Sequence, residues 1–280
     1  KNIYCFSSTL SSMVDMENLM NKNIKQFTPG HYMILRKNEL TKSFEFESIK
    51  QFTQLPAIIE HNYLDYNIGE LLYYALKSSV SKRILTSERP IGALLSGGLD
   101  SSLICALSQQ ILKENNKPPL ETFSIGLPGS EDLKYSSSVA NYIGSKHHQI
   151  ILSQEDFLNA IPNVIYDIES YDTTTVRASV GNWLIGKYIK ENTDIKVILN
   201  GDGADELMGG YLYFHKAPNN MLFDEECKRL LKYIHYYDVL RSDRSISSHG
   251  LEPRTPFLDK NFVNIYLQIQ VSKRNHVNYD

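Results

Sequence analysis

The chain has 280 residues, which is enough for one large domain or for one domain with part of a second. Hydrophobic residues make up 42% and charged residues 22% of it, a composition that excludes disordered, collagen-like and coiled-coil proteins. The 29 basic and 32 acidic residues give a formal net charge of −3, so we expect no nucleic acid as a partner. The sequence has no apolar run of bilayer length and no signal-peptide pattern, so we expect a cytoplasmic protein with no membrane partner.

The first part of the chain contains two patterns typical of strands. Residues 27–37 hold a Pro-Gly turn and an apolar run, and residues 43–49 alternate phenylalanine with polar residues. The polar stretch 51–66 is typical of a linker. The segment 67–85 has apolar residues four positions apart and begins with a capping-box pattern at Asn67, so it predicts a helix.

Short apolar runs then alternate with helical patterns. The runs predict buried strands at 91–95, 122–127, 147–152 and 196–200. The helical patterns follow Gly98 and recur at 132–145, 154–168 and 183–189. Together they predict an α/β fold, a parallel sheet with helices on both faces. Ligands bind such sheets at the carboxyl ends of the strands.

A glycine-rich loop, Ser96-Gly97-Gly98-Leu99-Asp100-Ser101-Ser102, lies between the first of these strands and its helix. Glycines let an anion approach the backbone, and hydroxyl and N–H groups at a helix start can hold phosphate oxygens. The carboxylate of Asp100 would repel phosphate unless a cation lay between them. The loop therefore predicts a pyrophosphate bound through Mg²⁺, with an ordinary glycine turn as the alternative.

A second glycine-rich loop, Asn200-Gly201-Asp202-Gly203-Ala204-Asp205-Glu206, follows the strand at 196–200. Three acids among small residues indicate a site for a metal and an electrophile. The alternatives are an acidic surface turn or a calcium loop, although the spacing of the acids does not fit an EF-hand.

The sequence blocks around these loops resemble a known family. SGGLDSS is similar to the pyrophosphatase loop of the ATP-pyrophosphatase ligases. TFSIGLPGSEDL, ESYDTTTVRAS, NGDGADELMGGYLYFHKAPN and HGLEPRTPFLDKNF resemble the synthetase domain of the glutamine-dependent asparagine synthetase family, in register from about residue 67 to 270. The resemblance implies a Rossmann-like ATP-pyrophosphatase domain over 67–280, without the end of the family domain. It also implies that 1–55 is the carboxy-terminal remnant of an N-terminal nucleophile glutaminase domain.

The resemblance implies ATP and Mg²⁺ as cofactors. Adenine would lie near Leu94 and Ile125, and ribose near Asn200 and Gly201. Mg²⁺ would be held by Asp100 and Asp205. The pyrophosphate would be held by the first loop, through Ser96, Gly97, Gly98, Asp100, Ser101 and Ser102.

The implied reaction joins ammonia to aspartate. The aspartate β-carboxylate would attack the α-phosphorus, giving β-aspartyl-AMP and pyrophosphate, and ammonia would then displace AMP. The matching catalytic positions are Asp202, Thr174, Thr175, Arg177 and Asp238. On the residues alone, Arg177 suits a substrate carboxylate or a surface salt bridge. Asp238, expected near the end of a helix over 224–241, could equally form an (i, i+3) surface pair with Arg241.

The sequence also departs from the family pattern. Asp202 replaces a common glutamate and Asn200 a common serine. The intact family begins with a catalytic cysteine, whereas this sequence starts at Lys1 and holds only the end of the domain that carries that cysteine. A lysine-bearing loop of the family lies beyond the 280 residues. By itself the chain is therefore expected to use at most free ammonia as the nitrogen donor. In the intact enzyme, glutamine is expected to be the normal source of the ammonia. The resemblance also implies a possible homodimer.

Two other functions stay open. One is a related adenylating ligase like the β-lactam synthetases, although that branch is expected to carry tyrosine at Asp202 and glutamate at Asp238. The other is a truncated nucleotide-binding protein without turnover.

Overall fold

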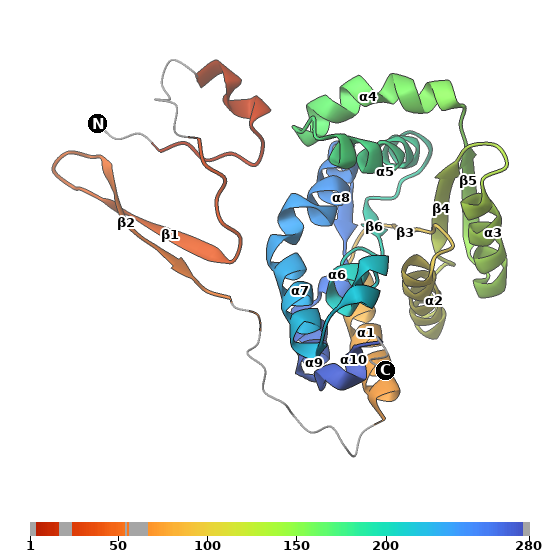
Figure 1. Cartoon of the computed structure of the whole chain (residues 1–280). Helices are drawn as coiled ribbons and strands as arrows, with labels where there is room; N and C mark the ends of the chain where they lie inside the picture. Colours follow the sequence, from red (N-terminus) through yellow and green to blue (C-terminus); the bar gives the residue numbers. More distant parts are fainter. Residues whose placement is uncertain (1–3, 17–23, 54, 56–66, 277–280) are drawn as a thin grey trace. The chain divides into compact units, whose positions relative to one another are not determined.

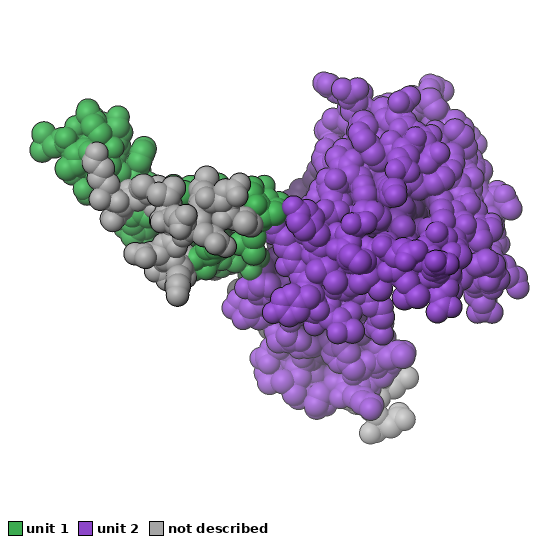
Figure 2. All heavy atoms as spheres, turned by 90° about the horizontal axis from the view of Figure 1, so that it is seen from above, with its two compact units in different colours: residues 1–56 green, residues 57–280 purple. Residues whose placement is uncertain are grey.

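The computed structural model describes residues 4–16, 24–53, 55 and 67–276. The chain divides into two compact units, residues 1–56 and residues 57–280 (Figure 2). Of the predicted linker 51–66, residues 54 and 56–66 lie outside the described residues, and Gln51 belongs to a strand and not to the linker. No helix in the described part of the chain is long and apolar enough to cross a membrane.

The first unit contains the two predicted strands. A short 3-10 helix, η1 (Ser11–Met16), precedes β1 (His31–Lys37) and β2 (Phe44–Gln51), which pair in antiparallel fashion with an irregularity after Ile34. None of the residues described in this unit is buried. A two-stranded ribbon cannot enclose a core, so large apolar side chains such as those of Phe44 and Phe46 remain exposed.

The second unit is built on a parallel sheet, as predicted, and the sheet has five strands, one more than the sequence indicated. Its strands are ordered β5-β4-β3-β6-β7 and comprise Lys146–Ile151, Glu121–Gly126, Ile91–Leu94, Val197–Leu199 and Glu252–Arg254. From the central β3 the chain adds β4 and β5 on one side, then returns to add β6 and β7 on the other. The short β7 contains Pro253, which explains why no strand was predicted there and why it lies at an edge.

Helices cover both faces of this sheet (Figure 1). One face packs mainly against α1 (Ile68–Leu85), α2 (Leu99–Glu114) and α9 (Lys260–Gln268). The other packs against α5 (Thr173–Asn192) and α8 (Asp238–Ser247). The remaining helices are α3 (Glu131–Ile143), α4 (Gln154–Ile168), α6 (Ala204–Met208), α7 (Asn220–Tyr233) and α10 (Val271–Arg274), with 3-10 turns η2 (Leu212–Lys216), η3 (Ile234–Tyr236) and η4 (Pro256–Leu258).

Local signals account for several helix ends. The Asn67 side chain accepts a hydrogen bond from the Glu70 N–H at 3.3 Å and caps α1 as predicted. Helix α5, by contrast, starts well before predicted residue 183, because Asp172 caps it by accepting from the Thr175 N–H at 2.8 Å.

The helix predicted over 224–241 is wrong in one respect. The chain leaves the helical conformation at Tyr237, where φ is −118° and ψ is −109°, and α8 starts afresh at Asp238. Asp238 is therefore the first residue of a helix that packs against α5, and does not lie near the end of one.

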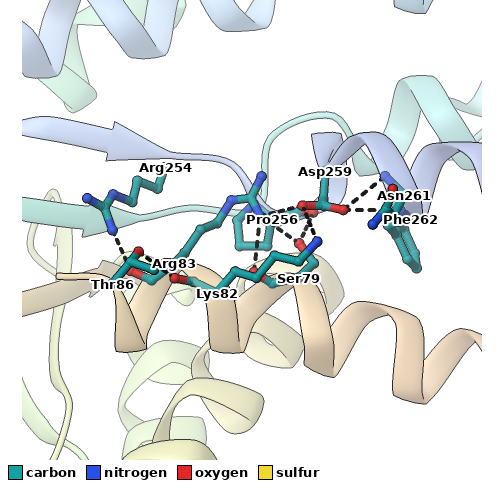
Figure 3. Close-up of polar contacts among 9 residues, drawn as sticks. All are labelled: Ser79, Lys82, Arg83, Thr86, Arg254, Pro256, Asp259, Asn261 and Phe262. Atoms are coloured by element: carbon teal, nitrogen blue, oxygen red, sulfur yellow. Dashed lines mark hydrogen bonds and ion pairs between the residues drawn. The ribbon is translucent and has the colours of Figure 1, made fainter.

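The segment from β7 to α9 is tied to α1 by polar contacts (Figure 3). The Ser79 hydroxyl donates to the Pro256 carbonyl at 2.6 Å, and Arg83 donates to the Asp259 carboxylate at 3.0 Å. Arg254 donates to the Arg83 carbonyl at 2.5 Å. These contacts hold β7 and the segment that follows it against α1, the first helix of the second unit.

Candidate active site

The two glycine-rich loops meet at the centre of the sheet. They follow β3 and β6, which are paired in parallel, so both leave the same edge of the sheet. The chain reverses its direction of strand addition between these two strands, which makes this edge the topological switch point where such folds bind ligands. Gly201 lies so close to the first loop that a Cβ there would be 3.0 Å from the Ser101 nitrogen.

The first loop forms a tight turn, and the start of α2, which follows it, has no side-chain cap. The Ser96 N–H donates to the Ser101 Oγ at 3.2 Å, and the two hydroxyls lie 2.9 Å apart. Gly97 has φ of +88°, and a Cβ there would be 2.7 Å from the Ser136 nitrogen, so a side chain does not fit. No side chain caps α2 at Gly98.

A buried hydroxyl in the same loop lacks a partner. Within the described residues, no group forms a hydrogen bond with the buried Ser102 Oγ. An unpaired buried hydroxyl is costly, and an anion at the start of α2 would supply an acceptor. These features fit a pyrophosphate.

Three carboxylates gather where the loops meet. Burial, together with the nearby charges of Asp205 and Glu206, raises the pKa of Asp100 to about 6. Burial and Glu206 also raise the pKa of Asp205. Such shifts mark negative charges that no cationic side chain in the described part of the chain compensates.

This set fits a divalent cation that takes further oxygens from a ligand. Although three carboxylates lie near one another here, the described residues form no set of three or more side chains placed to hold a metal ion by themselves. Mg²⁺ commonly binds one or two protein carboxylates together with substrate phosphates. Asp100 and Asp205 could therefore hold it against a pyrophosphate, and it would neutralise charge there.

A buried polar network lies beside the second loop. The Asn200 amide donates to the Asp202 carboxylate at 2.7 Å and to the Ser242 hydroxyl of α8 at 2.6 Å. Burial raises the pKa of Asp202 to about 6 even though Ser242 and the charge of Arg241 lower it. This network connects Asp202 of the second loop with α8.

A second chain of contacts connects α6 to α8. The Tyr211 hydroxyl donates to the Glu206 carboxylate and lies 3.1 Å from Asp238 Oδ2. Asp238 forms an ion pair with Arg241, and both side chains are mostly buried, so the pair is not a surface pair. The sequence analysis counted Glu206 among the three acids of the second loop but gave it no role of its own. It did not predict Tyr211 or Ser242 as site residues, because neither carries a local signal.

Among the described residues, no hydrogen bond or ion pair connects the predicted residues of α5 with this network. The Thr175 hydroxyl donates to Asp172 at 2.9 Å, so Thr175 serves the helix cap. Thr174 and Arg177 are exposed, and among the described residues Arg177 has no ion-pair partner. Helix α5 precedes β6 in the chain and runs antiparallel to it. The start of α5 therefore lies near the carboxyl ends of the strands, at the same edge of the sheet as the two loops.

The two apolar positions predicted for adenine lie on neighbouring strands. Leu94 ends β3 and Ile125 is near the end of β4, and both side chains are partly buried on the face covered by α5. They border the switch point and could flank a planar base.

Comparison with known proteins finds a matching family. The family model described as asparagine synthase matches residues 71–223 and 217–278. The glutamine-hydrolyzing asparagine synthetases of Mus musculus and Bos taurus are 44% and 42% identical over 262 and 280 residues. These matches cover 90% and 95% of this chain but 46% and 50% of the relatives, so the chain spans about half their length.

Among solved structures, the NAD+ synthetase from Burkholderia pseudomallei aligns with 75% of this chain and 84% of its own. The sequence identity is 12% and the TM-score is 0.38.

Proposed function

Since this chain belongs to the asparagine synthase family, we propose that it catalyses the ATP-dependent amidation of aspartate. The products would be asparagine, AMP and pyrophosphate. The observation that carries the proposal is the meeting of an uncapped helix start with uncompensated carboxylates at the switch point. That arrangement suits a nucleotide whose phosphates are bound together with a divalent cation.

The residues of the first loop would bind and orient the leaving group. N–H groups at the start of α2 and the hydroxyls of Ser96, Ser101 and Ser102 would hold the pyrophosphate. Asp100 and Asp205 would hold Mg²⁺, which supplies positive charge near the phosphates. Leu94 and Ile125 would flank the adenine, with ribose near Gly201.

The reaction would proceed by two displacements. An oxygen of the aspartate β-carboxylate attacks the α-phosphorus, and the bond to the β-phosphate oxygen breaks as pyrophosphate leaves. Ammonia then attacks the acyl carbon of β-aspartyl-AMP, and AMP leaves with the bonding electrons. The protein contributes chiefly by positioning the reactants and by balancing charge. Asp202, Thr174, Thr175, Arg177 and Asp238 would act at the amino-acid end, Thr175 by fixing the start of α5.

Further parts of the proposal concern the whole protein. We propose that glutamine supplies the ammonia in the whole protein and that residues 1–55 belong to a glutaminase domain. The exposed apolar side chains of the β1–β2 ribbon support this, because they would suit a larger sheet. We also propose a homodimer, for which the family resemblance is the only support. A cytoplasmic location is supported by three cysteines that are all free thiols.

The test is pyrophosphate release from Mg-ATP with ammonium, measured with and without aspartate, with the amino-acid product identified. Aspartate-dependent pyrophosphate, AMP and asparagine are expected. Asp100→Asn should abolish release, whereas Asp132→Asn, an exposed acid in the first turn of α3, should leave it unchanged. ADP and phosphate would contradict the proposal. Nucleotide binding without release would favour a protein without turnover, and a cyclised product would favour the related ligases.

A further inference from the structure

Tyr211 occupies a position between the two halves of the proposed site. Its hydroxyl donates to Glu206 and lies 3.1 Å from Asp238 Oδ2, and these carboxylates come from different elements, α6 and the start of α8. Glu206 lies beside the acids proposed to meet the metal and phosphates. Asp238 lies at the amino-acid end.

One hydroxyl proton cannot satisfy two carboxylates at once. Glu206 is almost fully buried, at 2% exposure, and among the described residues no cation pairs with it. Asp238 is compensated by Arg241. The hydroxyl therefore donates to Glu206, whose buried negative charge has no cationic partner among the described residues. The negative charge of Asp238 is balanced by Arg241 instead.

We propose that Tyr211 is a positioning residue that couples nucleotide binding to aspartate binding. A cation bound next to Asp205 would compensate Glu206 and release the hydroxyl, which could then donate to Asp238. Asp238 would thereby be fixed in the orientation that receives the amino acid. Two alternative hydrogen bonds of one hydroxyl provide the two states that such coupling requires. The inference rests on the proposed function.

A neighbouring tyrosine offers a matched control. The Tyr213 ring stacks on that of Tyr211 with centroids 6.0 Å apart, and its hydroxyl also donates to a carboxylate, that of Glu226, at 2.8 Å. Glu226 keeps Arg229 as a partner at 2.7 Å. Tyr213→Phe therefore removes a similar hydroxyl, while the ring and a charge partner remain.

The experiment measures aspartate affinity by calorimetry, with and without Mg²⁺ and α,β-methylene-ATP, in which the bond to be broken is blocked. In the wild type, the analogue should tighten aspartate binding at least about fivefold, the lower end of ordinary coupling. Tyr211→Phe should reduce this factor to less than about twofold, while Tyr213→Phe keeps it. Urea midpoints of the three proteins would show whether each variant is folded.

The outcomes separate the two proposals. Full coupling in Tyr211→Phe, absence of coupling in the wild type, or equal loss in both variants would overturn the inference alone. A wild-type chain that releases asparagine supports the proposed function whatever the coupling. A wild-type chain that binds no aspartate would overturn the proposed function and this inference together.

Discussion

Asp202 is a buried carboxylate whose ionised form is destabilised by its surroundings. Burial raises its pKa to about 6, whereas an unfolded aspartate titrates near 3.9. Between these values the folded state binds more protons than the unfolded state, so this group makes the free energy of unfolding fall as the pH rises from about 4 to about 6. Asp202→Asn should remove this loss. The free energy of unfolding of the variant should therefore rise relative to that of the wild type between about pH 4 and about pH 6. Above pH 6 the difference should stay constant, at no more than roughly 3 kcal/mol.

Urea unfolding from pH 2.5 to pH 7.5 would measure this difference and would also cover the range in which the control below titrates. Asp172→Asn is the control of opposite sign, because hydrogen bonds from Thr175 lower the pKa of Asp172. That carboxylate stabilises the fold above the unfolded pKa, and its contribution is lost as the pH falls through the lowered value. A stability difference for Asp202→Asn that does not change with pH would contradict the assignment.

Gly201 is a residue at which one methyl group should alter nucleotide binding. A Cβ would be 3.0 Å from the Ser101 nitrogen and 3.1 Å from the Asp100 Cβ, tighter than the backbone can accept without moving. Gly201→Ala should push the loops apart and raise the KM for ATP by roughly tenfold or more, since small misplacements are costly in catalysis. Gly181→Ala is the control, because the nearest atom there is 3.9 Å away. An unchanged KM in Gly201→Ala would show that the loops tolerate separation.

At the scale of elements, the contact between α1 and the start of α9 depends on Asp259. Burial alone would raise its pKa, but the hydrogen bonds from Arg83 and from the backbone of Asn261 and Phe262 outweigh it and lower the pKa. Asp259→Asn keeps the cap and loses the ion pair, so it should cost about 1 kcal/mol, and Asp259→Ala about 2–3 kcal/mol.

Urea unfolding of the two variants would measure these costs. Glu114→Gln, which breaks the more exposed pair with Lys77, should cost less than either substitution. Equal losses for the asparagine and alanine variants would mean that the cap adds nothing.

At the scale of the whole molecule, the described hydrophobic clusters all lie in the second unit. A chain of residues 67–280 should therefore unfold with the same urea midpoint as the 280-residue chain, while residues 24–56 alone should show no cooperative transition. Circular dichroism of the three chains would measure this. A clearly lower midpoint for 67–280 would show that the first unit stabilises the second.

The sequence by itself determined the parallel α/β fold and the placement of both loops after strands, because hydrophobic periodicity and glycine positions are local signals. It also determined the N-terminal cap of α1 at Asn67, and it predicted residue types that suit a phosphate and metal site. Tertiary structure decided that α8 starts at Asp238 and that Pro253 lies in an edge strand. It also decided that Tyr211 meets Asp238, 27 residues away in the chain. These features depend on packing between distant segments, and no local pattern encodes which distant side chains will share a hydrogen bond.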